Sequence, residues 1–119
     1  MKILEYGYYD ISSNDTEVKE NITKAVALST DVVSVLPGYL RVAKNILKNT
    51  DTILSTVIDY PFGTSCLQAR KEETENALKC GAKIIELVAP NHSLCNKKYD
   101  RFRKDINEQM TLCDRYDAE

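Results

Sequence analysis

Residues 52–63 read TILSTVIDYPFG, an apolar run that ends in an acid, an aromatic residue, a proline and a glycine. The run over 52–58 predicts a buried strand, because β-branched and apolar residues pack well on a pleated surface. Pro61 then fixes the direction of the chain, and Gly63 permits a turn geometry that other residues rarely adopt. The stretch therefore predicts a strand that ends in a rigid corner.

This corner is either part of a binding site or an ordinary turn. Parallel strands of α/β proteins present their ligand sites at their carboxyl ends, so Asp59 and Tyr60 would line such a site. A plain connection from strand to helix uses the same residue types. The sequence leaves both interpretations of Asp59 and Tyr60 open.

The same alternation of strand and helix signals runs along the whole chain. Residues 12–17, SSNDTE, are typical of a helix start, since their side chains cap free backbone N–H groups. Pro37 fits the first turn of a second helix, Gly81 ends a third, and residues 90–93 predict a loop. Strands are predicted at residues 2–9, 31–36, 52–58 and 83–89, each followed by a helix, the last at roughly 98–113.

Four consecutive βα units predict an α/β fold with parallel strands. The near-continuous apolar character of the later strands predicts a sheet with both faces covered. Two architectures fit this pattern: an open, doubly wound sheet, and half of a TIM (βα)8 barrel, which typically needs about 250 residues. In either architecture, residues 1–119 form a single domain.

The overall composition limits the binding partners and the cellular compartment that we expect for the protein. With 119 residues, a net charge of −2 and a pI of about 5.5, the chain gives no reason to expect nucleic acid or a membrane as a partner. The basic cluster at 97–104 also contains an acid and predicts a solvated helix face. The charged start predicts no secretory leader, and the four cysteines form no CxxC pair. We therefore expect reduced thiols and a cytoplasmic protein.

Two polar residues near the fourth predicted strand are candidates for chemistry. Glu86 stands among apolar neighbours. Facing inward, it would need hydrogen-bond partners and could move protons. Facing outward, it would extend between helices to solvent or pair with a helix lysine. His92, the only histidine, is either a proton shuttle or a solvated loop residue. His92 and Cys95 have H-x-x-C spacing, but no second pair completes a zinc site, so we expect no metal and no cofactor.

Taken in order, the strand-end motifs resemble those of deoxyribose-phosphate aldolase, a class I aldolase on a (βα)8 barrel. In that family a strand with a small residue leads to a proline, as Ser34 and Pro37 do here, and the next strand reads T-V-x-x-F-P-x-G. The likeness covers about residues 28–110 and rests on VVSVLPGYLRVAKNIL (32–47), TVIDYPFG (56–63) and ETENALKCGAKIIELV (73–88).

The resemblance implies an activity and roles for particular residues. The family cleaves 2-deoxyribose 5-phosphate reversibly to glyceraldehyde 3-phosphate and acetaldehyde, through a Schiff base on a strand lysine. An aspartate on its fourth strand relays protons, and Glu86 falls at that position with one more methylene. Ser34, Asp59, Tyr60 and His92 would line the site of the sugar-phosphate substrate.

The sequence also departs from the family pattern. The Schiff-base lysine of the family lies on the sixth strand and its phosphate site in the seventh and eighth loops, whereas four units are recognisable here. Lys83 would stand at the amino end of its strand, and the first strand, EYGYY (5–9), is atypical. The resemblance therefore implies the N-terminal half of an aldolase barrel, an incomplete chain that is inactive alone.

Two other interpretations stay open. Four parallel strands would leave two open edges and an apolar inner face that needs a cover. The chain would then be a noncatalytic half-barrel that associates with itself or with another chain, so a homo-oligomer is expected if no C-terminal half is present. A flavodoxin-like sheet that binds a phosphate ligand is the other alternative, and the lack of a glycine-rich phosphate loop argues against it.

Overall fold

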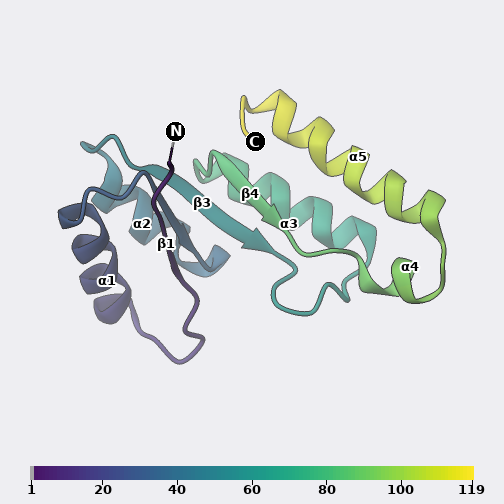
Figure 1. Cartoon of the computed structure of the whole chain (residues 1–119), viewed down its shortest axis with the longest axis horizontal. Coiled ribbons are helices and arrows are strands. Elements are labelled where there is room, and N and C mark those ends of the chain that lie inside the picture. The colour runs from purple at the N-terminus through teal and green to yellow at the C-terminus, as the bar shows by residue number, and fades with distance from the viewer. Residues whose placement is uncertain (1) are drawn as a thin grey trace.

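The computed structural model describes residues 2–119 and contains one parallel sheet. Its strands lie side by side in the order of the sequence, β1-β2-β3-β4, and every neighbouring pair is parallel (Figure 1). The strands are β1 (Glu5–Tyr8), β2 (Val32–Val35), β3 (Ile53–Ile58) and β4 (Ile84–Leu87).

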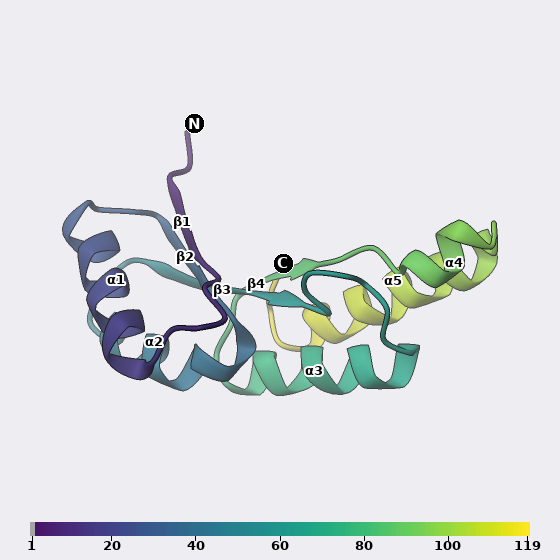
Figure 2. The ribbon, with the colours of Figure 1, turned by 90° about the horizontal axis from the view of Figure 1, so that it is seen from below.

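The main helices all lie on one side of this sheet (Figure 2). A doubly wound sheet reverses its strand order and carries helices on both faces, whereas a barrel keeps sequential order with its helices outside. The chain is therefore half of a TIM-barrel arrangement. The helices cover one face of the sheet, and β2 and most of β3 are nevertheless buried on both faces. The main helices are α1 (Asp15–Ala27), α2 (Leu40–Leu47), α3 (Leu67–Lys79) and α5 (Tyr99–Arg115).

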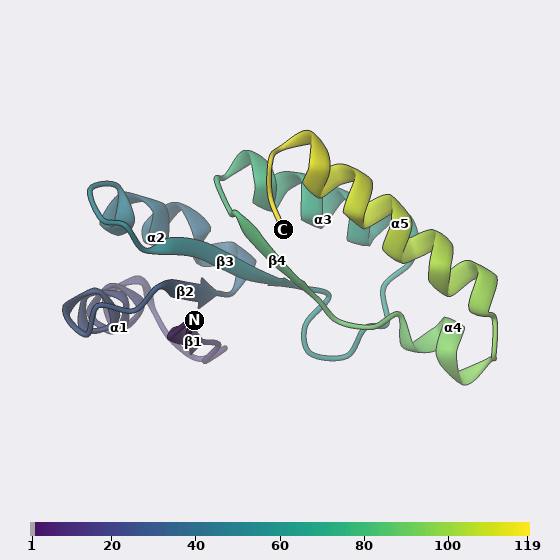
Figure 3. The same ribbon diagram turned by 45° about the horizontal axis from the view of Figure 1, so that its top comes forward.

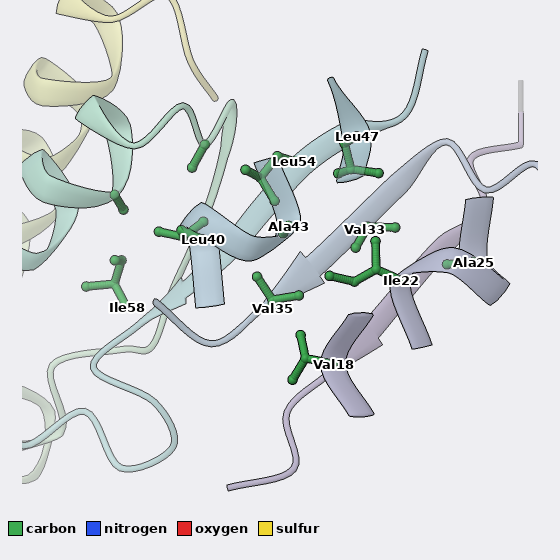
Figure 4. Packing of buried hydrophobic residues seen from close by; sticks show 12 residues of the cluster. Val18, Ile22, Ala25, Val33, Val35, Leu40, Ala43, Leu47, Leu54 and Ile58 are labelled. Atoms are coloured by element: carbon green, nitrogen blue, oxygen red, sulfur yellow. The ribbon is translucent and has the colours of Figure 1, made fainter. Parts of the chain in front are cut away.

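The hydrophobic core fills the space between the helices and the covered face. Side chains alternate along a strand, so Val33 and Val35 of β2 point toward α1 and α2 (Figure 4). Val18 and Ile22 of α1 pack against them and are fully buried. Burial of each such side chain contributes about 1.5–3 kcal/mol, which makes this cluster the main source of stability.

Helix α5 packs along α3, and the two run side by side in Figures 1 and 3. Leu78 of α3 and Leu112 of α5 form a second, smaller apolar cluster, which Ile85 of β4 joins. Among residues 2–119, no helix is both long and apolar enough to cross a membrane.

Several boundaries differ from the prediction. The expected loop at residues 90–93 is a short helix, α4 (Asn91–Cys95), and Pro37 begins a 3-10 turn, η1 (Pro37–Tyr39), before α2. The outer strands are shorter than predicted, because only residues 5–8 and 84–87 find strand partners. The first helix starts where expected: Asn14 caps it, and Glu17 completes a capping box.

The two edges of the sheet differ. Beside β4, the backbone of Glu119 behaves like the start of a parallel neighbour. Its N–H donates to the carbonyl of Lys83 at 2.9 Å, and its carbonyl accepts from the N–H of Ile85 at 2.7 Å. Beside β1, no strand pairs with the outer edge in the part of the chain that the structure describes.

Candidate active site

The face of the sheet that no helix covers, called the uncovered face below, carries a polar cluster centred on Glu86. Its Oε1 accepts hydrogen bonds from the Oγ of Ser34 at 2.6 Å and the Oγ of Ser55 at 2.9 Å. The hydroxyl of Tyr9 donates to the same oxygen at 3.2 Å. Both serines are fully buried, so this face is polar at its centre and not apolar as the sequence suggested.

Strand register brings these side chains together. Ser34 and Ser55 are direct partners on β2 and β3, and Glu86 is the partner of Val57, two residues beyond Ser55. The same alternation that sends the neighbours of Ser34 into the core turns Ser34 toward the uncovered face. Glu86 therefore faces inward, toward the side of the sheet that carries no helices. Among the ion pairs of residues 2–119, no helix lysine pairs with it.

Gly7 explains how Tyr9 reaches this cluster. A Cβ on Gly7 would stand 2.9 Å from the Tyr9 ring, so the missing side chain leaves the space in which the ring lies. Glycine has a low strand propensity, but at this position it allows the hydroxyl of Tyr9 to reach Glu86. Glu5, on the same strand, is the second carboxyl group near Glu86.

The pKa values of the two carboxyl groups in the cluster, Glu5 and Glu86, shift in opposite directions. Burial acts to raise the pKa of Glu86, but the hydrogen bonds from Ser34, Ser55, Glu5 and Tyr9 outweigh it, and the pKa lies below its usual value. Burial and the neighbouring Glu86 raise the pKa of Glu5. Glu5 therefore retains its proton to a higher pH than Glu86 does.

The phenol of Tyr9 stays protonated in this setting. Burial is the largest cause that raises its pKa, to about 12, and the charges of Glu86 and Glu5 add to the effect. A protonated phenol can only donate to Glu86, which fixes the direction of that hydrogen bond.

Asp59 lies at the end of β3, but its carboxylate contacts Arg70 and Ser65 and not the Glu86 cluster. Its Oδ2 is 2.7 Å from the Nη1 of Arg70 and also accepts from the backbone N–H of Ser65, whereas its Oδ1 accepts from the hydroxyl of Ser65. Burial acts to raise the pKa of Asp59, and the bonds from Arg70 and Ser65 outweigh it and lower the pKa. Arg70 is fully buried and also bonds Asp105 at 3.1 Å, so this group ties the corner to α5.

The remaining predicted site residues divide between two places. The ring of Tyr60 lies 5.2 Å from that of Tyr9, which puts it beside the Glu86 cluster. His92 is exposed on α4 and lines a different cavity, to which no member of the Glu86 cluster contributes. The structure thus brings Ser34 and Tyr60 near Glu86 and leaves Asp59 and His92 apart from it.

Glu5 and Tyr9 lie at a predicted strand end, but the sequence predicted no role in the site for them or for Ser55. Ser55 interrupts an apolar run as Ser34 does, and aligning the two runs as neighbouring strands would have paired them. Within the described residues, no group of three or more His, Cys, Asp or Glu side chains is placed to hold a metal ion. Lys83 stands at the amino end of β4, where its Nζ donates to the carbonyls of Tyr116 and Asp117, each at 2.9 Å.

The known proteins described here, which are similar to the chain in sequence or fold, are aldolases. No protein-family model matches the chain. It is 28% identical over 105 residues to a deoxyribose-phosphate aldolase of Staphylococcus epidermidis, covering 88% of this chain and 48% of that protein. It is 32% identical over 90 residues to one of Staphylococcus carnosus, covering 76% and 38%. The tetrameric deoxyribose phosphate aldolase of Aeropyrum pernix superposes with a TM-score of 0.85 at 18% identity, covering 96% and 47%.

The sheet order and the superposition define the class of fold, a TIM barrel, of which this chain has half the strands. The sequence matches confirm the resemblance seen in the motifs: the two curated relatives described above are deoxyribose-phosphate aldolases, and the chain is similar to 48% and 38% of their lengths. It spans about half the length of the curated relatives it matches.

Proposed function

We propose that this chain supplies the proton-transfer half of an aldolase site that cleaves 2-deoxyribose 5-phosphate. The observation that carries the proposal is the Glu86 carboxylate, held by Ser34, Ser55 and Tyr9 on the uncovered face. The names of the relatives support the substrate class. The proposed Schiff-base route uses an amine and a proton relay and calls for no further cofactor.

In this reaction the substrate hydroxyl loses a proton as the carbon–carbon bond breaks, and the bonding electron pair passes to the carbon conjugated with the Schiff base. A proton must later return to that carbon. Glu86, with its lowered pKa, is suited to accept a proton through water, and Glu5, with its raised pKa, is suited to restore one. The amine would come from a lysine outside residues 1–119, since Lys83 is engaged at the opposite end of β4.

The test uses the protein purified from its source, together with any polypeptide that accompanies it. Acetaldehyde and borohydride should trap a reduced adduct on a lysine outside residues 1–119, and peptide mass spectrometry would locate it. Glu86→Gln should lower the rate of acetaldehyde release by roughly 100-fold or more. Glu20→Gln, which removes an exposed carboxylate on α1, should leave the rate unchanged. An unchanged rate in Glu86→Gln would remove the proposed role.

The open β1 edge favours a second function, that of a noncatalytic half-barrel that associates with a second copy. Ile3, Leu4 and Ile11 flank this edge and are 66%, 55% and 87% exposed. Exposed strand edges and apolar side chains favour association. Sedimentation analysis separates the two functions: a stable homodimer without a trapped adduct would favour the scaffold.

A further inference from the structure

A cavity of about 500 Å³ lies apart from the Glu86 cluster, between the start of α3 and the helices α4 and α5. The loop that follows β3 forms one wall through Ser65 and Cys66. His92 of α4 and two cations of α5, Arg101 and Lys104, form the other. Cavities of this size hold small molecules rather than extended polymers.

The charge of this cavity is positive. Arg101 and Lys104 are three residues apart on α5 and therefore share a face of the helix. Asp105 is the one carboxylate among the described lining residues, and the fully buried Arg70 already pairs with it at 3.1 Å. Lys104 has only a long contact of 3.8 Å with Glu108, in which Lys104 is largely exposed. The two cations are thus left with little compensating charge.

Hydrogen-bond donors surround the same space. Thr64 and Ser93 supply hydroxyl groups, and His92 supplies a ring N–H, whereas the hydroxyl of Ser65 already donates to Asp59. The first turn of α3 carries no acidic residue and no side-chain cap, so its partial positive charge adds to that of the two cations. A guanidinium and an ammonium on one helix face, with hydroxyl donors opposite, are suited to a doubly charged tetrahedral anion.

We propose that this cavity binds the phosphate group of a small phosphorylated molecule. The proposal stands on the cations of α5 and the enclosed volume, and it does not depend on the aldolase activity. A nucleic acid is disfavoured, because the chain carries a net charge of −2 and its free cations lie in a cavity rather than along an open stripe.

Cys66 offers a direct readout. It is exposed and lines the cavity, whereas Cys95 is exposed and does not line it. Alkylation of the full chain by iodoacetamide, a neutral reagent, would be followed at each cysteine by mass spectrometry. Inorganic phosphate and glycerol phosphate, at constant ionic strength, should slow alkylation of Cys66 severalfold and leave Cys95 unchanged. Glycerol alone should protect neither cysteine.

Matched variants make the test specific. Arg101→Gln should abolish the protection of Cys66, and Arg41→Gln, which removes an exposed arginine on α2, should retain it. Circular dichroism would confirm that both variants stay folded. Equal protection by chloride, or protection that survives in Arg101→Gln, would overturn the proposal. Protection by a single-stranded oligonucleotide that exceeds protection by glycerol phosphate would overturn the choice of a small ligand.

Discussion

The hydroxyl of Ser34 donates a hydrogen bond of 2.6 Å to Glu86, although 52 residues separate the two in the chain. Strand β3 lies between the two strands that carry these residues. It is the shortest of the bonds that Glu86 accepts from Ser34, Ser55 and Tyr9, and it links the second strand to the fourth across the uncovered face.

Ser34→Ala should raise the pKa of Glu86, because the carboxylate loses a donor that favours its charged form. An NMR pH titration of the side-chain carboxyl carbons measures the shift. Ser12→Ala is the matched control: Ser12 donates to Asp10, so the control should raise the pKa of Asp10 and leave Glu86 alone. No change at Glu86 in Ser34→Ala would show that this bond does not set its pKa.

Glu5→Gln should stabilise the fold at neutral pH. The pKa of Glu5 is higher in the folded protein than in the unfolded chain, where it is about 4.5. Protonated Glu5 therefore contributes its full stabilisation below pH 4.5, and this stabilisation is lost as the pH rises through the pKa of the folded state. Glutamine removes this loss. Because Glu5 is largely exposed, the gain is small, about 0.2–1 kcal/mol, and should vanish below pH 4.

Thermal unfolding between pH 3.5 and 8 measures this difference. Glu20→Gln, on the exposed face of α1, should show no such pH-dependent gain. A stability difference for Glu5→Gln that grows as the pH falls would contradict the assigned direction.

Arg70→Met should destabilise the protein by about 3–5 kcal/mol. Arg70 is fully buried and pairs with both Asp59 and Asp105. The substitution leaves these two carboxylates without a compensating positive charge. Urea denaturation gives the value. Arg103→Met removes an exposed arginine paired with Asp100 and should have a much smaller effect. Equal effects in the two variants would mean that the buried charge group contributes little.

Gly63→Ala should destabilise the corner after β3 by more than about 2 kcal/mol. Gly63 has a φ of +63°, and a Cβ there would overlap the backbone carbonyl of Ala89. Gly38→Ala is the control, since a Cβ on Gly38 meets no atom within 4 Å. Urea denaturation of both variants tests this, and a neutral Gly63→Ala would show that the loop after β3 rearranges freely.

The four βα units were predictable because each carries its own local signals. Residues 52–58 have the composition of a buried strand, Asn14 and Glu17 form the expected capping box, and Gly81 ends α3 with a φ of +100°. Short segments with mixed signals were harder to assign. Residues 91–95 form one helical turn, too short for a periodic pattern to reveal.

The candidate site was only partly predictable. Glu86 drew attention because a charge inside an apolar strand needs partners. Its partners could not be named, because Tyr9 reaches it across 77 residues and Ser55 across 31. Asp59 shows the opposite case: its position at the end of β3 suggested a ligand contact, and the tertiary structure gives its carboxylate to Arg70.

The sequence by itself determined the order of strands and helices, the parallel sheet and the family motifs, because these depend on local residue patterns. Only the tertiary structure decided that the helices cover one face, that Glu5, Ser34, Ser55 and Tyr9 gather around Glu86, and that a cationic cavity forms beside α5. These features depend on strand register and helix packing, which bring together residues whose separation along the chain carries no signal of their contact.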